Sequence, residues 1–121
     1  MKAGSFFRKQ RTGENYIMSK EKEKIINTIE ELQDVVDLFY QQNDQKAFEK
    51  MDVALLNVEN AVDIFATYQI ENPEFEIDMN KICDTLKQTM DALEKGDKVL
   101  VADILQYEFI EYLNDLSSTM Q

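Results

Sequence analysis

Carboxylates and a single thiol are the first side chains to consider for chemistry, because this chain of 121 residues contains no histidine. Its absence excludes the usual Ser-His-Asp and Cys-His nucleophilic arrangements, histidine-ligated zinc and Glu-x-x-His di-iron sites. Cys83 has no histidine to activate it, and its place beside Ile82 is typical of a buried structural thiol. We therefore expect no enzymatic activity.

Paired carboxylates remain as candidates for cation binding. Glu111 and Asp115 are one helical turn apart, so both could contact a hard cation. One acidic turn is common in helices, however, and the sequence has no calcium-loop pattern. Its three glycines, at positions 4, 13 and 96, form no phosphate-binding loop. We expect no metal ion and no cofactor.

Charge is distributed unevenly along the chain. Residues 1–20 hold five of the 13 basic residues and one of the 24 acidic residues, so the remainder has a net charge of −15. An acidic body repels nucleic-acid phosphates, which argues against nucleic acid as a partner. Such a body is better suited to attracting a basic protein partner.

The cysteine content and the apolar runs suggest a cytoplasmic protein. A single cysteine cannot form an intramolecular disulfide, so nothing indicates a secreted, oxidised fold. Apolar runs such as Val99 to Ala102 are far shorter than the roughly 20 residues that cross a bilayer. We expect neither a membrane association nor a targeting segment.

The elements that would position these groups are helices. Three glycines and one proline leave room for long helices joined by short connections, so the class is all-α. Apolar spacing predicts a single antiparallel four-helix bundle in residues 19–121, with helices at about 20–42, 45–70, 73–95 and 98–118. The predicted leader, residues 1–18, is basic and flexible.

The second predicted helix carries the most regular pattern. Its apolar residues alternate between steps of four and three, which is typical of a helix packed lengthwise in a bundle. The stripe comprises Ala47, Met51, Ala54, Val58, Ala61, Phe65 and Tyr68. Phe48, Leu55 and Val62 form a parallel row, which predicts contact with two neighbouring helices.

Three residues mark the later helix boundaries. Asn72 is a favoured cap and Pro73 fits the first helical position, so we expect the third helix to start at Pro73. Gly96 can adopt the left-handed conformation that ends a helix, and Asp97 can cap the next one. The short turn predicts that the last two helices are antiparallel.

The last helix has the highest apolar content and is the predicted binding surface. A helix that is apolar on most sides is either central in the fold or presents a face to a partner. Glu108 lies among its apolar residues and could make a polar contact within a groove, although a position at the margin is the simpler interpretation. The candidate partner-binding residues are Val101, Ile104, Leu105, Glu108, Phe109 and Tyr112.

The order of the helices and one motif carry a family resemblance. The layout from Leu32 to Leu116, broken by QQNDQKA and later by ALEKGDKVLVADIL, resembles the flagellar export chaperone that holds the C-terminal segment of flagellin. The run from Glu94 to Glu108 is similar to one in small uncharacterised acidic helical-bundle proteins of Gram-positive bacteria. The resemblance implies a helical fold and a possible chaperone role, but no binding residues.

Two functions remain from different classes. The first is a non-enzymatic protein-binding module, such as a chaperone or adaptor that holds an amphipathic helix of a partner in a hydrophobic groove. The alternative is a structural protein that closes its apolar surface by homodimerisation. Sedimentation of the purified protein would distinguish them.

Overall fold

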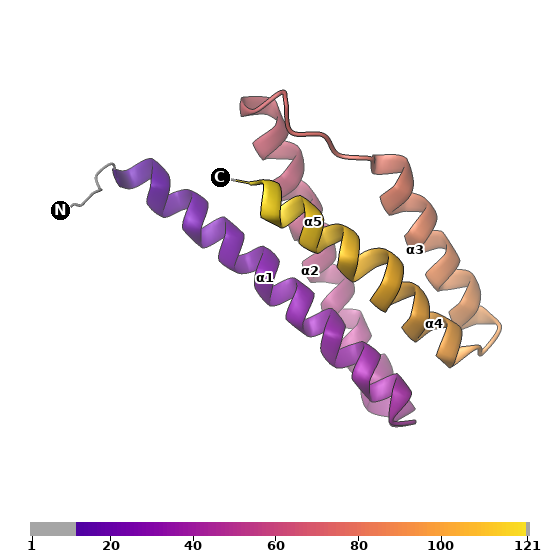
Figure 1. Cartoon of the computed structure of the whole chain (residues 1–121). Coiled ribbons are helices and arrows are strands. Elements are labelled where there is room, and N and C mark those ends of the chain that lie inside the picture. The colour runs from indigo at the N-terminus through magenta and orange to yellow at the C-terminus, as the bar shows by residue number, and fades with distance from the viewer. Residues whose placement is uncertain (1–11, 121) are drawn as a thin grey trace.

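The computed structural model describes the backbone of residues 12–120 and the side chains of residues 20–120 (Figure 1). Within this range the chain is all-α and contains no strand, which confirms the predicted four-helix fold. The last predicted helix is continuous, because the residues at both of its internal joints keep right-handed helical dihedrals. It consists of three parts, two α-helical and one π-helical. The elements are α1 (Thr12–Tyr40), α2 (Asp44–Glu71), α3 (Met79–Glu94), α4 (Lys98–Ile104), the π-helical η1 (Leu105–Ile110) and α5 (Glu111–Thr119).

Helix α1 lies between two neighbours. It packs against α2 and, on another side, along α4, η1 and α5, whereas α3 packs against α4 and η1. Figure 1 shows α1 and the α4–η1–α5 helix running in opposite directions. Lys22 accordingly donates to the carbonyl of Met120 at one end, and Tyr40 reaches Asp103 toward the other.

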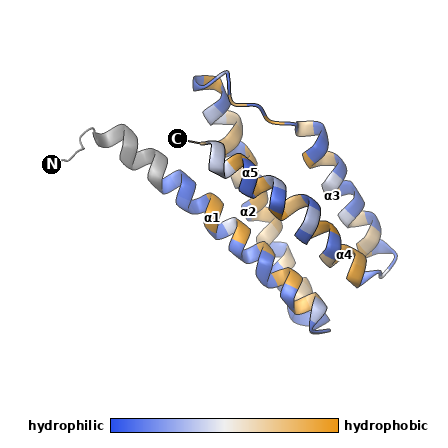
Figure 2. Ribbon diagram, viewed as in Figure 1, coloured by the Kyte–Doolittle hydropathy of each residue, from blue (hydrophilic) through white to orange (hydrophobic). Residues whose placement is uncertain are grey.

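The predicted apolar stripe of α2 is confirmed residue by residue. Its seven members are the buried residues of this helix, from Ala47 to Tyr68. Small alanines in the stripe allow the backbones of α1 and α2 to approach closely. The parallel row remains partly exposed, and Phe48 is 40% exposed beside Phe39, with ring centroids 5.3 Å apart. Figure 2 shows polar colours over much of the visible helix surface.

The predicted start of the third helix at Pro73 is wrong. Residues 72–78 form a connection, in which Asn72 accepts a hydrogen bond from the backbone of Phe75 at 2.8 Å. This bond places Pro73 at the second position of a turn, where its fixed backbone angle is equally favourable. Phe75 is buried and packs against Phe65, with ring centroids 6.0 Å apart, so tertiary packing selects the turn.

Aspartates cap the two later helices. Asp78 accepts a hydrogen bond from the backbone of Lys81 at 3.0 Å, and α3 begins after it. Asp97 accepts one from Leu100 at 3.1 Å, which confirms its predicted capping role. Gly96 has φ of 74°, the left-handed conformation expected there.

The π-helical segment has a physical explanation in the spacing of buried residues. Val101, Leu105, Phe109 and Leu113 are all buried and follow one another at steps of four. In an ideal α-helix each such step rotates a residue roughly 40° around the axis, so the stripe would drift away from the core. A π turn accommodates one extra residue and offsets this rotation.

The N-terminal boundary differs from the expected one. Helix α1 begins at Thr12 instead of about residue 20, and ends at Tyr40. Residues 1–11 of the predicted flexible leader lie outside the described part of the chain, and its residues 12–18 fall within α1. No helix among the described residues is long and apolar enough to cross a membrane.

Candidate functional site

The predicted partner-binding residues do not form one surface. Four of them are core residues of the bundle, at most 7% exposed, so a partner would reach them only if the bundle opened. These are Val101, Ile104, Leu105 and Phe109. Burial of an apolar side chain of this size stabilises the fold by about 1.5–3 kcal/mol, which accounts for their apolar character without a partner.

The other two predicted residues lie at the surface with different roles. Glu108 is exposed, and no described residue forms an ion pair with it. The half-buried Tyr112 accepts a hydrogen bond from the backbone of Asp78 at 2.7 Å. The ammonium group of Lys81 lies 5.4 Å from the centre of its ring. Tyr112 therefore fastens the start of α3 to the last helix.

An exposed apolar strip does exist on the last helix, but on its other side. Val99, Leu100 and Tyr107 are 61%, 42% and 65% exposed. Leu100 and Tyr107 are seven residues apart, so they share a face, and Asp103 lies between them. Figure 2 shows the beginning of α4 in the hydrophobic colour.

Tyr40 joins this strip from the end of α1. It is 45% exposed, and its hydroxyl donates a hydrogen bond to the carboxylate of Asp103. Nearby, Gln33 of α1 donates to Gln106 at 2.8 Å. We call the set Tyr40, Leu100, Asp103 and Tyr107 the tyrosine patch.

The electrostatics of the patch are visible in Tyr40. Its hydrogen bond to Asp103 raises its pKa from 10.0 to about 12, with further contributions from desolvation, from the negative charge of Asp103 and from the electrostatic influence of Tyr107. Each cause disfavours the phenolate. Tyr40 therefore remains a neutral hydrogen-bond donor at physiological pH, and Asp103 retains acceptor capacity for a further donor.

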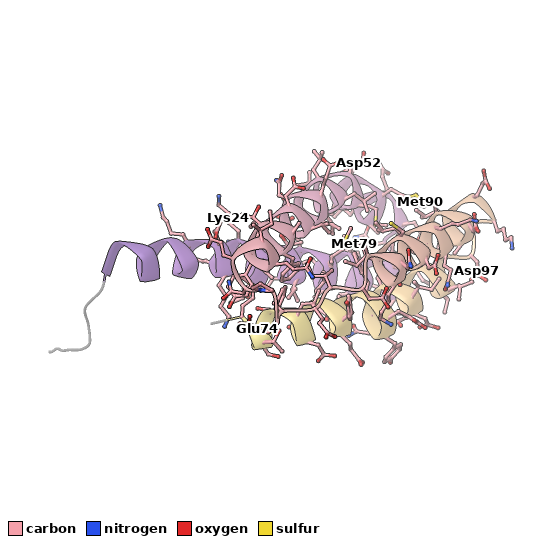
Figure 3. The ribbon with its side chains drawn as sticks, turned by 90° about the horizontal axis from the view of Figure 1, so that it is seen from above. Lys24, Asp52, Glu74, Met79, Met90 and Asp97 are labelled. Carbon is pink, nitrogen blue, oxygen red and sulfur yellow. The ribbon has the colours of Figure 1, made fainter. Side chains whose placement is uncertain are left out.

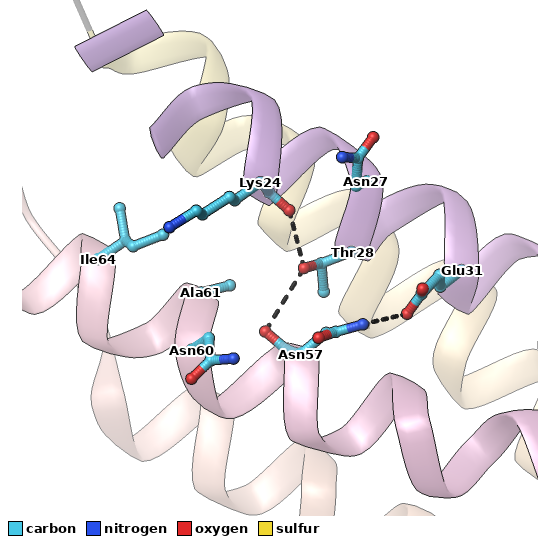
Figure 4. A pocket seen from close by; sticks show the side chains of 8 residues that line it. All are labelled: Lys24, Asn27, Thr28, Glu31, Asn57, Asn60, Ala61 and Ile64. Atoms are coloured by element: carbon cyan, nitrogen blue, oxygen red, sulfur yellow. Dashed lines mark hydrogen bonds between the residues drawn. The ribbon is translucent and has the colours of Figure 1, made fainter. Parts of the chain in front are cut away.

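A polar hollow of about 570 Å³ lies between α1 and α2 (Figure 4). Asn57 donates to the carboxylate of Glu31 across it, and the hydroxyl of Thr28 donates to the carbonyl of Lys24 at 2.9 Å. The first bond links α2 to α1 and the second lies within α1, while the same hydroxyl also approaches the carbonyl of Asn57 on α2 at 3.4 Å. These contacts satisfy polar groups that would be costly to bury unpaired. The hollow contains no base next to a nucleophile, so we interpret it as a structural seam.

The single thiol is not where the sequence predicted. Cys83 is exposed, so the expectation that it is buried is wrong. Its neighbour Ile82 is buried, and adjacent residues on a helix point about 100° apart, which carries Cys83 out of the core. Among the described residues, no three cysteines, aspartates or glutamates are grouped so that they could hold a metal ion.

Total apolar content, the sequence signal of the last helix, does not reveal the tyrosine patch. The spacing of the last helix could have separated its two sides, since the buried residues recur at steps of four. Val99, Leu100 and Tyr107 fall outside that series. Asp103 could not be linked to the patch from local pattern, because its partner Tyr40 is 63 residues away in the chain.

Comparison with known proteins places the chain in one family. Residues 17–119 match DUF8042, a domain of unknown function, and the chain belongs to that family. Neither the curated proteins nor the solved structures contain a match.

Proposed function

We propose that the protein is a non-enzymatic protein-binding module that holds a basic amphipathic helix of a partner protein on the tyrosine patch. One observation carries this proposal: Tyr40, Leu100 and Tyr107 are all more than two-fifths exposed around one carboxylate. Tyrosine is enriched among the residues that dominate binding energy at protein interfaces, because its ring is large and its hydroxyl can still bond.

Charge supports a basic partner. Asp103 lies within the patch, and the chain beyond residue 20 has a net charge of −15. A lysine or arginine of the partner can donate to Asp103 while its apolar face covers Leu100 and Tyr107. Long-range attraction toward so acidic a surface also raises the association rate.

A second candidate is a homodimer that buries the same surface. The exposure of Val99, at 61%, favours it, because this residue extends the apolar strip beyond the patch. Charge argues against it, since each copy has a net charge of −11 and Asp103 of both copies would approach the interface. We therefore rank the basic partner first.

The proposed binding of an amphipathic helix also suggests a cellular role. A bundle that covers an amphipathic helix of another protein would act as a chaperone or adaptor, in line with the layout resemblance to the flagellin chaperone. A single cysteine, exposed on α3, suits a reducing cytoplasm. We therefore propose a cytoplasmic chaperone-like protein and, in keeping with the resemblance, a bacterial one.

A defined peptide tests the proposal. The probe is a labelled helix-forming peptide with leucines on one face and lysines on the other, and fluorescence anisotropy measures its dissociation constant. We expect Tyr107→Ala and Leu100→Ala to weaken binding about tenfold each, equivalent to about 1.4 kcal/mol. A peptide with glutamates in place of the lysines should bind far more weakly.

A matched surface variant serves as the control. Leu56 on α2 is 63% exposed and lies on the side opposite the buried stripe, so Leu56→Ala should leave peptide affinity unchanged. Equal binding of the glutamate peptide, or an equal loss with Leu56→Ala, would refute the proposal. Sedimentation velocity of the unliganded protein addresses the alternative, because a tight dimer dispersed by Leu100→Asp would favour homodimerisation.

A further inference from the structure

A second hollow lies beside the C-terminal end of α5, at the end of the bundle away from the tyrosine patch. Its volume is about 460 Å³. Buried apolar side chains form its floor, and exposed carboxylates form its rim. The floor consists of Tyr68, Phe75 and Leu116, and the rim consists of Glu74, Glu76 and Asp115. We call this hollow the acidic pocket.

The connection between α2 and α3 builds the pocket. Phe75 packs edge to face on Tyr68, with ring centroids 4.9 Å apart, and its carbonyl accepts a hydrogen bond from Gln69 at 3.0 Å. This anchoring fixes the neighbouring Glu74 and Glu76 over the end of α5. Figure 3 shows Glu74 beside α5, at the end of the bundle beyond which α1 extends.

Within residues 20–120 the negative charge of the pocket is uncompensated. No described residue forms an ion pair with Glu74, Glu76 or Asp115, and no basic side chain is among the residues that line the pocket. Like charges close together destabilise a fold modestly, and a cation placed among them relieves the repulsion. An apolar floor inside an acidic rim suits a segment that combines aromatic and basic side chains.

We propose that the acidic pocket binds residues 6–11 of the same chain, Phe-Phe-Arg-Lys-Gln-Arg. This segment has the required composition, with Phe6 and Phe7 for the aromatic floor and three basic residues for the carboxylate rim. The segment and the rim have matching charge, three basic side chains and three carboxylates, and Arg8 and Lys9 follow the phenylalanines directly in the sequence. It is independent of the proposed function, because the pocket and the tyrosine patch lie at opposite ends of the bundle.

The segment is long enough to reach the pocket. Lys22 of α1 donates to the carbonyl of Met120 at 3.2 Å, next to Thr119, which also lines the pocket. From Lys22 back to Thr12, a helix covers roughly 15 Å. From Thr12 to Phe6, extended chain covers roughly 20 Å. The segment can therefore fold back along α1 and place its phenylalanines at the end of α5.

Paramagnetic broadening in NMR spectra of the full chain tests the contact. A nitroxide label is attached at Ser5→Cys in a Cys83→Ser background, so that the exposed native thiol does not react. We expect strong loss of amide peak intensity at Phe75, Glu76 and Leu116, and none at Gly96 in the turn at the far end. The broadening should weaken at high salt, because the Debye length falls to about 3 Å at 1 M.

Charge reversal supplies the matched control. Glu74→Lys with Glu76→Lys should abolish the broadening, whereas Asp91→Lys with Glu94→Lys makes the same change in net charge near the far end of α3 and should preserve it. All four positions are exposed, so the fold tolerates the changes. Absent or uniform broadening, or equal effects of both double variants, would overturn the proposal.

A mixing experiment distinguishes contact within one chain from contact between two chains. Spin-labelled protein without ¹⁵N is mixed with ¹⁵N-labelled protein without the spin label, so that any broadening arises between molecules. We expect none in this mixture. Broadening at Phe75 in the mixture, equal to that within a single sample, would make a second copy the donor of the segment and would overturn the proposal as stated.

Discussion

Helix α2 and the α4–η1–α5 helix solve the same packing problem in different ways. Both place a continuous buried stripe against the bundle core, from Ala47 to Tyr68 in α2 and from Val101 to Leu116 in the last helix. In α2 the stripe alternates steps of four and three, which a regular α-helix keeps on one side. In the last helix the first part of the stripe advances by fours, and the π turn keeps it on the core.

The difference explains where sequence reasoning succeeded. A regular α-helical period identified every buried residue of α2. In the last helix, total apolar content without a period pointed to Val101, Leu105 and Phe109 as surplus surface, whereas they are in the core. An apolar helix thus does not by itself indicate a binding helix, because its period decides which side is covered.

The largest difference between the two helices should appear when one residue is deleted from each. Deletion of Glu108 changes the step from Leu105 to Phe109 from four to three, which restores the regular alternation, so the protein should fold with an ordinary α-helix there. Deletion of Glu59 shortens the step from Val58 to Ala61 and turns the rest of the α2 stripe about 100° away from α1. Cooperative unfolding should then be lost.

Circular dichroism during thermal unfolding checks both deletions. Glu59 and Glu108 are both exposed, and neither forms a salt bridge with a described residue, so the loss of a side chain does not distinguish them. If the deletion of Glu108 unfolded the protein as completely as that of Glu59, the explanation of the π turn by the spacing of buried residues would be wrong.

Alanine substitutions should separate the inner and outer sides of the last helix. Phe109→Ala should cost about 3–5 kcal/mol of unfolding free energy, as should Phe65→Ala in α2, because both side chains are at most 1% exposed. Leu100→Ala should stay within about 0.5 kcal/mol, since it removes an exposed side chain. Urea unfolding measures all three. An unchanged unfolding free energy in Phe109→Ala would contradict the burial of Phe109 in the core.

The smallest expected effect concerns the hydrogen bond between Tyr40 of α1 and Asp103 of α4. The raised pKa of Tyr40 favours its neutral form in the fold, so this group stabilises the protein at pH values below 10 and the benefit disappears as pH rises through about 12. Asp103→Asn should shift its titration back toward 10. Ultraviolet absorbance of tyrosine ionisation monitors this, with Tyr40→Phe identifying the group. An unchanged titration in Asp103→Asn would contradict the assigned cause.

The candidate site was only partly predictable from sequence. Exposure of Glu108 agrees with its interpretation as a residue at the margin, and the choice of the last helix for partner binding remains a prediction. The individual residues of the patch depend on which side α1 and α3 cover. Tyr40 meets Asp103 across 63 residues of chain, a contact that no local pattern encodes.

Some features of the fold follow from local sequence alone. The sequence by itself determined the all-α class, the α2 stripe, the left-handed turn at Gly96 and the cap at Asp97, because each depends on helical period or backbone preference over a few residues. Tertiary structure decided the rest. The burial of Phe75 against Phe65 moved the start of α3 to Met79, and the core selected a π turn that left Leu100 and Tyr107 outside. In both places packing between distant residues selected the local conformation.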